Sequence, residues 1–159
     1  MSRKRAMRKI SEYGKQLAEK QKCKAEYGVR EKQFSNYYKK ASASVGITGE
    51  ELLKGLELRL DNVLYRSGLY HSRKQARQAI VHGHICVDDK LVNIPSYQIG
   101  IHQEFKIKDP KNARLGEQEV AKWLKVDQKK CSGKVERLPE REESSQEIDE
   151  QLVVEFYSR

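Results

Sequence analysis

The segment His71–Ile94 reads HSRKQARQAIVHGHICVDDKLVNI and carries the clearest structural pattern in the chain. Ser72, followed three residues later by Gln75, has the pattern of a capping box, which begins a helix. Gly83 is suited to end that helix, because glycine readily adopts left-handed backbone. Apolar residues then alternate on both sides of Asp88–Asp89, which predicts a β-hairpin with a two-aspartate turn. The segment therefore predicts a short helix followed by a hairpin.

A leucine-rich run, ELLKGLELRLDNVLYRSG at residues 51–68, precedes this unit and predicts the main core helix. Thr48 and Glu51 would form its capping box, Gly68 would end it, and Gly55 would allow a bend. After the hairpin, alternating Ile99, Ile101, Phe105 and Ile107 predict one or two further strands. The order helix, helix, strands predicts an α+β module.

The flanking segments divide the rest of the chain. Residues 11–27 and 29–43 read as helices, the second with an apolar stripe at Phe34, Tyr37, Tyr38 and Ala41. A helix is expected within residues 111–126, and the β-rich run QLVVEFYS at the end is expected to be a strand that folds back on the body. We therefore expect a basic arm at 1–10, a helical domain at 11–49, the helix–hairpin module at 50–115 and a C-terminal extension at 116–159 that returns to the helical domain.

Charge is distributed unevenly along the chain. The net charge is +9 at pH 7, and the first forty residues alone hold thirteen Lys or Arg against four Glu. A basic chain with its excess in one segment favours a polyanion partner, most often nucleic acid. The clustered candidates in the N-terminal part are Arg3, Lys4, Arg5, Arg8, Lys9, Lys15, Lys20, Lys22, Lys24, Arg30, Lys32, Lys39 and Lys40.

Three cations lie close together on the predicted helix after Ser72. Arg73 and Arg77 are four residues apart and Lys74 is three before Arg77, so like charges share a helix surface at a cost of roughly 0.2–0.5 kcal/mol per pair. The helix itself holds no acidic residue to offset them. Either this is a solvated helix face, or the cations bind backbone phosphates and release counterions. The tyrosines among the N-terminal cations could stack on bases, but their apolar stripe favours core packing.

Other functional classes find little support in the sequence. His82, His84 and Cys86 form HxHxC, but a structural zinc site needs four ligands and no second cluster is present, so no metal or cofactor is expected. Nucleotide-binding and hydrolase motifs are absent, which argues against an enzyme. Three scattered cysteines fit a reducing compartment, and we expect neither a signal peptide nor a membrane span.

Longer motifs resemble a known family. RLDNVLYRSG and SRKQARQAIVHGHICVDDKLVNIPSYQI closely resemble the RNA-binding module of small ribosomal subunit protein four of bacteria and organelles. That module also occurs in some pseudouridine synthases, tyrosyl-tRNA synthetases and a heat-shock protein. The flanks SEYGKQLAEKQKCKAEYGVREKQFSNYYKKA and WLKVDQKKCSGKVERLPERE, with the closing EIDEQLVVEFYSR, resemble the ribosomal protein specifically. The resemblance covers about residues 9–159.

The resemblance implies a non-enzymatic ribosomal protein of the cytoplasm or an organelle. It would bind the 5′ domain of 16S rRNA first, nucleate assembly of the 30S body, contact neighbouring protein five and lie near messenger RNA where that strand enters the subunit. By position, the RNA-binding residues of the module would be Arg59, Arg66, Ser72, Arg73, Lys74 and Arg77, alongside the N-terminal cations. The residues facing protein five would be Gln151, Val153, Glu155 and Tyr157.

Two departures and two alternatives accompany this interpretation. Family members usually carry about forty more N-terminal residues, some with a zinc-binding cysteine cluster, and Asp89 stands where the hairpin turn usually has glycine. The main alternative is a free-standing RNA-binding stress or regulatory protein built on the same module. A pseudouridine synthase with the module attached would need a catalytic domain for which this chain has no room.

Overall fold

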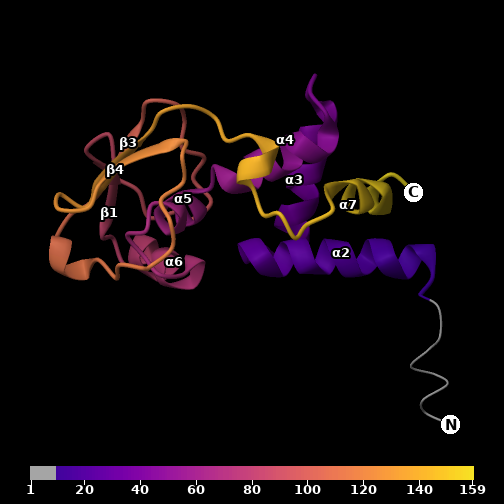
Figure 1. The fold of residues 1–159 in the computed structure, drawn as a ribbon, viewed down its shortest axis with the longest axis horizontal. Helices are drawn as coiled ribbons and strands as arrows, with labels where there is room; N and C mark the ends of the chain where they lie inside the picture. Colours follow the sequence, from indigo (N-terminus) through magenta and orange to yellow (C-terminus); the bar gives the residue numbers. More distant parts are fainter. Residues whose placement is uncertain (1–9) are drawn as a thin grey trace, which may run out of the picture.

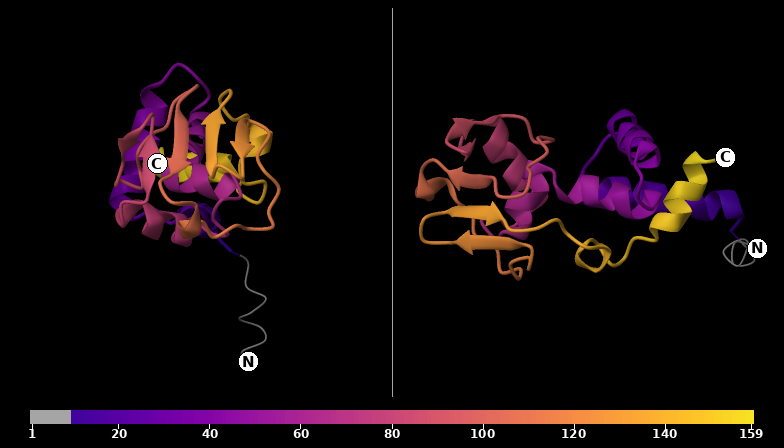
Figure 2. Two further views of the ribbon diagram at one scale, coloured as in Figure 1. Left: turned by 90° about the vertical axis from the view of Figure 1, so that its left-hand side faces the viewer. Right: turned by 90° about the horizontal axis from the view of Figure 1, so that it is seen from above.

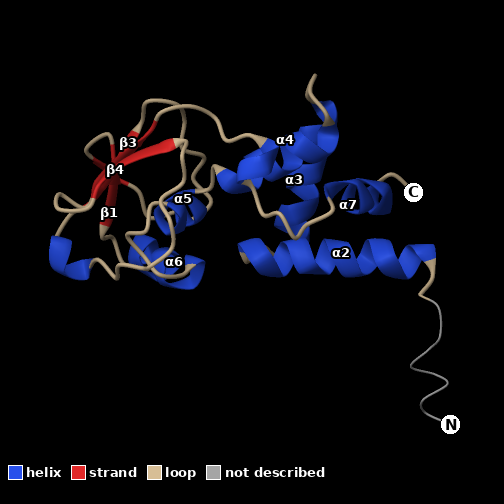
Figure 3. Ribbon diagram, viewed as in Figure 1, coloured by secondary structure: helices blue, strands red, loops and turns tan. Residues whose placement is uncertain are grey.

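The computed structural model describes residues 10–159, which form two lobes lying side by side (Figure 1). One lobe contains only helices, and the other combines helices with every strand (Figure 3). The helical lobe comprises α2 (Glu12–Tyr27), α3 (Glu31–Ala43), α4 (Thr48–Glu57) and α7 (Glu150–Tyr157). The second lobe, here called the module lobe, comprises α5 (Leu60–Arg66), α6 (Arg73–Val81), β1 (Ile85–Val87), β2 (Lys90–Leu91), β3 (Glu104–Ile107), β4 (Leu124–Asp127) and β5 (Ser132–Val135). The predicted α+β class is confirmed.

The Ser72 cap predicted at α6 is formed, and Ser11 caps α2 in the same way. Ser11 accepts a hydrogen bond from the Gly14 amide at 3.0 Å, and Ser72 accepts one from the Gln75 amide at 3.1 Å. Gly28 follows α2 with φ 68°, a left-handed conformation that glycine adopts without steric cost. Local sequence therefore determines where both helices begin, and at α2 also where the helix ends.

The predicted leucine-rich helix is broken into two. α4 ends at Glu57, and Arg59 has extended backbone (φ −64°, ψ 139°) that pairs with Gln98 before α5 begins. The break does not fall at Gly55, which instead lets the Tyr37 ring pack closely: an added Cβ would lie 3.3 Å from it. The Thr48 capping box is also wrong, since Ile47 occupies the N-cap without a side-chain hydrogen bond.

The break also shifts the expected division of the chain. Apolar side chains of α4 pack with those of α2 and α3 in one core, whereas α5 and α6 pack with the sheet in another. The lobes therefore meet near residue 58 rather than at 49–50. Strands β4 and β5 extend the module lobe to Val135, and only the segment after them returns to the helical lobe.

Five antiparallel strands in the order β2-β1-β3-β5-β4 form one sheet with a buried and an exposed face. Phe105 and Ile107 are buried, whereas Leu91 and Ile101, which belong to the same alternating patterns, are 57% and 45% exposed. In the β1–β2 turn Asp88 and Asp89 both have positive φ, 49° and 65°, so the expected two-aspartate turn is present.

Residues 111–126 do not form the expected helix. The segment contains the end of a 3₁₀ turn, Pro110–Asn112, followed by loop and then β4. Trp123 is nevertheless fully buried in the module core, as its apolar bulk suggested. The stretch between the turn and Trp123 lacks an apolar stripe, so nothing would hold a helix against the core.

The expected C-terminal strand is instead helix α7. Asp149 caps it by accepting from the Gln151 amide at 3.1 Å, and Val153 is fully buried in the core of the helical lobe. Tyr157, one turn later, stacks on Tyr38 with ring centroids 4.8 Å apart. α7 lies along α2 at the end of the molecule opposite the strands (Figure 2). Docking on a preformed apolar surface overrides the β preference of adjacent valines.

Candidate nucleic-acid interface

A network of buried polar side chains joins the two lobes. The Tyr27 hydroxyl at the end of α2 donates to Glu57 Oε2 at 2.6 Å, and the Asn62 amide donates to Glu57 Oε1 at 2.8 Å. Glu57 also receives two hydrogen bonds from Arg66, at 3.0 and 2.9 Å. Because Glu57 is fully buried, this set of partners satisfies a carboxylate that would otherwise be costly to desolvate.

Electrostatics within this network follow from burial and pairing. Burial, with the Glu57 charge beside it, raises the pKa of Tyr27, so the hydroxyl remains a donor. Burial by itself would lower the pKa of Arg66, but the hydrogen bonds and charge of Glu57 outweigh it and raise the pKa. Tyr27 and Arg66 therefore both stay protonated and can donate their hydrogen bonds to Glu57.

Arg73 and Arg77 are directed into the junction between the lobes. Arg73 donates to Asn62 Oδ1 at 2.9 Å, approaches Glu26 at 3.5 Å, and its guanidinium carbon lies 4.9 Å from the centroid of the Tyr27 ring. Arg77 donates to Asp61 Oδ2 and to the Tyr27 carbonyl, each at 3.4 Å. The helix itself offers these two arginines no counter-charge, but other elements of the protein do: Glu26 for Arg73 and Asp61 for Arg77.

Arg59 and Arg66 are likewise engaged inside the protein. Arg59 is 3% exposed and contacts both carboxylate oxygens of Asp61, at 3.1 and 3.0 Å. Arg66 makes the two-point contact with Glu57 and retains 22% of its side-chain exposure. A guanidinium paired with a carboxylate at two points fixes the orientation of α5. Only the exposed part of the Arg66 side chain is accessible to a phosphate.

Two lysines predicted to bind RNA have partners within the helical lobe, on α3 and α7. Lys20 is 6% exposed, pairs with Glu31 at 2.6 Å, and lies 4.4 Å from the centre of the Phe156 ring. Lys24 also reaches Glu31, at 3.0 Å. These ion pairs join α2 to α3, and the contact of Lys20 with Phe156 joins α2 to α7.

The other predicted cations within the described part of the chain are accessible. Lys74 is exposed on α6, and the Ser72 side chain is engaged in its cap. On α2 and α3, residues seven apart share a helix face, which aligns Lys15 with Lys22 and Lys32 with Lys39. The exposed predicted cations are Lys15, Lys22, Arg30, Lys32, Lys39, Lys40 and Lys74. The expected cations Arg3, Lys4, Arg5, Arg8 and Lys9 lie outside the described residues.

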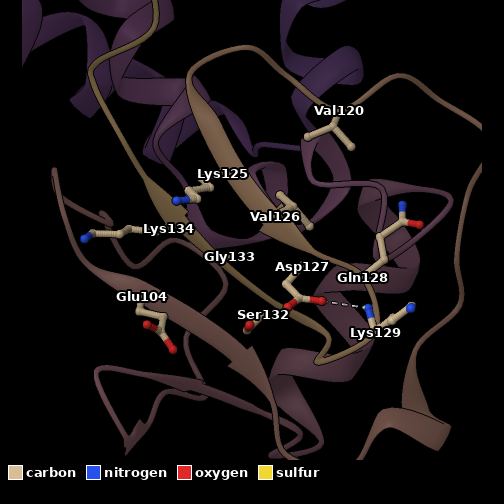
Figure 4. Close-up of a pocket in the computed structure, with 10 residues that line it drawn as sticks. All are labelled: Glu104, Val120, Lys125, Val126, Asp127, Gln128, Lys129, Ser132, Gly133 and Lys134. Carbon is tan, nitrogen blue, oxygen red and sulfur yellow. Dashed lines mark hydrogen bonds between the residues drawn. The ribbon is translucent and has the colours of Figure 1, made fainter.

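Sequence reasoning missed a second basic surface on the exposed face of the sheet. Lys125 and Lys134 lie opposite each other on β4 and β5, a like-charge pair that costs free energy when isolated. Together with Lys129 they surround an open hollow of about 810 Å³, with Glu104 and Asp127 as its acidic members (Figure 4). The single lysines among apolar residues in LKV (124–126) and GKV (133–135) were the available signal, but they could not show that the two strands are neighbours.

The predicted protein-binding face at the C-terminus is divided by the helix. Gln151 is exposed and Glu155 half-buried on one side of α7, whereas Val153 is in the core and Tyr157 donates to Glu31 Oε2 at 2.9 Å. The resemblance had implied that all four face protein five. The helix leaves Gln151 and Glu155 as the members available to a partner, and assigns Val153 to packing.

Neither a metal cluster nor a bilayer-spanning helix is found among residues 10–159. No group of three or more His, Cys, Asp or Glu side chains in this range is arranged to hold a metal ion. Cys23, Cys86 and Cys131 are free thiols, and burial raises the pKa of Cys23 to about 12, which makes it unreactive at neutral pH. The described helices are too short or too polar to cross a bilayer.

The two lobes correspond to two known domain families, which together define a protein of the ribosomal S4 class. Residues 58–105 match the S4 domain, and residues 1–57 match the ribosomal protein S4/S9 N-terminal domain. The junction between the two matches falls at the break between α4 and α5.

Comparison with whole proteins defines the family. Over 98% of its length the chain is 51% identical to the small ribosomal subunit protein uS4 of Dictyoglomus turgidum, covering 79% of that relative. It is 48% identical to the uS4 of Lachnospira eligens over 98% of its length, covering 84% of that protein, and 47% identical to that of Thermodesulfovibrio yellowstonii, covering 77%. The chain belongs to the uS4 family, which consists of structural ribosomal proteins rather than enzymes.

Proposed function

We propose that this protein is a structural constituent of the small ribosomal subunit that binds 16S rRNA directly, within the 5′ domain, and nucleates assembly of the 30S body. The observation that carries the proposal is the coupling, through buried ion pairs, of two lobes that each carry exposed cations. Glu57 and Asp61 are both fully buried and both bridge to arginines at the lobe junction. Such a connection fixes the angle between α2–α3 and α5–α6, so that exposed cations on both lobes can meet one folded RNA.

Rigid geometry matters for a protein that binds early in assembly. Phosphate contacts supply affinity and register, while recognition of a junction of RNA helices depends on holding several contacts at fixed separations. Exposed Lys15, Lys22, Lys32 and Lys39 would contact backbone phosphates from the helical lobe, and Lys74 from the module lobe. Arg59, Arg66, Arg73 and Arg77 would act chiefly by holding these surfaces in position.

We further propose that the exposed side of α7, at Gln151 and Glu155, faces neighbouring protein five and influences translational accuracy. The basic segment containing Arg5, Arg8 and Lys9 would lie near messenger RNA where that strand enters the subunit. Both contacts are what the resemblance to the family implies, and the exposure of Gln151 supports the first. The protein would act in the ribosome, without a cofactor.

The test is binding of the full chain to a 5′-domain transcript of 16S rRNA and to an equally long transcript from another domain. We expect specific binding that is at least 10³-fold tighter to the 5′ domain at physiological salt, within the range typical of specific recognition of nucleic acid. In cell lysate, the protein should co-sediment with small subunits through a moderate-salt wash. Equal affinity for both transcripts, with the protein at the top of the gradient, would instead indicate a free-standing RNA-binding protein.

A further inference from the structure

A small polar hollow lies on the side of α6 opposite the lobe junction. Its volume is about 200 Å³, and its wall includes Gln75 and Gln78 of α6 and His82, which caps the end of α6. These residues are three and four apart, so they share one helix face, whereas Arg73 and Arg77 occupy the other side. Across the hollow lie Tyr70, His84, Asn112 and Arg114.

The lining is rich in hydrogen-bond donors and contains no carboxylate. It comprises one guanidinium, two imidazoles, three amides and the Tyr70 phenol, with Ala79 as the remaining member. Arginine, asparagine, glutamine and tyrosine side chains are the types that commonly contact phosphate oxygens in nucleic-acid complexes. The composition therefore favours an anion over a cation.

Tyr70 supplies an independent observation. Its side chain is 1% exposed, and its hydroxyl has no hydrogen-bond partner among the described residues. A buried hydroxyl left without a partner costs free energy, so each such group calls for a ligand or an ordered water. The Tyr70 oxygen is closed to solvent in this structure, so a ligand in the hollow reaches it only when a neighbouring side chain moves aside. Burial raises the pKa of Tyr70 to about 12 although Arg114 acts in the opposite direction, so the hydroxyl keeps its proton and can donate.

Backbone contacts hold the two sides of the hollow together. Tyr70 and Arg114 pair as a parallel β-bridge, and the Arg114 amide donates to the Leu69 carbonyl at 3.0 Å. Arg114 Nη1 donates to the carbonyls of Lys111 and Ala113, at 3.0 and 2.8 Å, which fixes the guanidinium while leaving its other nitrogens available. The backbone on the two sides of the hollow is thus held in place before any ligand arrives.

We infer that this hollow binds a phosphate group, and that in the proposed RNA complex it receives one backbone phosphodiester beside α6. That the phosphate belongs to RNA rests on the proposed function, but phosphate binding by the hollow can be tested with inorganic phosphate alone. Lys74 is exposed and lies one helical turn before Gln78, so an RNA strand following this face would meet Lys74 and the hollow in succession.

The first experiment is a ¹H–¹⁵N chemical-shift titration of the full chain with inorganic phosphate at constant ionic strength. We expect saturable shifts confined to amides of residues 75–84 and 112–114 in the unmodified chain. Arg114→Gln should abolish saturation and Tyr70→Phe should weaken binding roughly three- to tenfold, the effect of losing one hydrogen bond. Lys122→Gln removes one exposed charge outside the hollow and should change nothing. Absent saturation, or equal binding by all variants, would mean that the hollow holds only water.

The second experiment determines whether RNA uses the site. With the 5′-domain transcript, Arg114→Gln should reduce the log–log salt slope of binding by roughly 0.7–0.9, whereas Tyr70→Phe should lower affinity without changing the slope. An unchanged slope in Arg114→Gln would overturn the RNA assignment even if phosphate binds. If the unmodified chain fails to bind the transcript, the proposed function is wrong. The phosphate titration still shows whether the hollow binds phosphate.

A folding control is available for Tyr70→Phe. Tyr70→Phe retains the buried ring and removes a hydroxyl that lacks a protein partner, so in phosphate-free buffer its urea midpoint should equal or exceed that of the unmodified chain. A marked drop in the midpoint would show that the hydroxyl already has a structural partner, and would overturn the inference.

Discussion

Tyr27 and Glu57 are joined by a 2.6 Å hydrogen bond between side chains that are both fully buried, thirty residues apart in sequence. Tyr27 ends α2 and Glu57 ends α4, so the bond lies where the helical lobe meets α5 and α6. The Tyr27 hydroxyl also accepts from the Ser145 amide at 3.4 Å, which connects the C-terminal segment to the same point. One buried carboxylate thereby organises three separate stretches of chain.

Glu57→Gln should be strongly destabilising. The substitution keeps the shape of the side chain but leaves Arg66 without its charge partner. We expect a loss of about 3 kcal/mol in the free energy of unfolding, the lower end for broken buried pairs because Arg66 retains some exposure. Urea denaturation of this variant beside Glu136→Gln, an exposed control, measures the difference. Equal midpoints for the two variants would show that the Glu57 network contributes no net stability.

Glu31 should make stability depend on pH in the acid range. Partial burial by itself would raise its pKa, but hydrogen bonds from Lys20, Lys24 and Tyr157 lower that pKa to about 2 from the usual 4.5. Between these two values the unfolded chain binds more protons at this residue than the folded chain. The contribution of Glu31 is therefore complete above about pH 4.5 and is lost as the pH falls toward 2.

The measurement is the urea midpoint as a function of pH for the unmodified chain and for Glu31→Gln. The variant should show a smaller fall in stability between pH 4.5 and 2, although Glu143 and Glu150, whose pKa values are also lowered by arginine partners, still contribute. Parallel profiles for the two proteins would contradict the assigned role of Glu31.

The helix–hairpin unit could be predicted because its signals are local. The Ser72 cap, the small residues of α6 and the two aspartates of the turn each depend on residues within a few positions. Helix α7 could not be predicted in the same way. Its valines favour a strand in isolation, and the surface of α2 and Tyr38 that makes it a helix is contributed by residues more than a hundred positions away.

The candidate site shows the same division between local and long-range information. The sequence correctly identified α6 as a cationic helix but could not reveal that Arg73 and Arg77 have acidic partners, since Glu26 and Asp61 precede them by 47 and 16 residues. The leucine-rich run visibly contains the acidic residues Glu57 and Asp61. Their directions depend on the helix break after Glu57, however, so the sequence alone does not indicate which arginines they pair with.

Val153→Ala tests the helical assignment of the C-terminus. Val153 is fully buried between α7 and the helical core, so removing two methyl groups should cost about 2 kcal/mol of stability. Gln151→Ala, at an exposed position on the same helix, should stay within about 0.5 kcal/mol of the unmodified chain. Urea denaturation measures both. Similar small effects at the two positions would favour an exposed strand with no packed face.

Lys74 and Arg77 should differ in how they support RNA binding. Lys74 is exposed, so Lys74→Gln should leave the urea midpoint unchanged while reducing the log–log salt slope for the 5′-domain transcript by roughly 0.7–0.9. Arg77 instead contacts Asp61 and the Tyr27 carbonyl. Arg77→Lys keeps the charge but loses this fork-shaped contact, so it should cost about 1 kcal/mol of stability and leave the slope nearly unchanged.

The pair separates a residue that contacts RNA from one that positions the contacting surface. Binding isotherms at four or more salt concentrations, with denaturation curves on the same preparations, give both readouts for each variant. If Arg77→Lys lowers the slope as much as Lys74→Gln does while its stability is unchanged, then Arg77 contacts phosphate directly and the ion pair with Asp61 opens when RNA binds. If the expected pattern is found, the ion pair persists and holds α6 against α2 throughout the encounter.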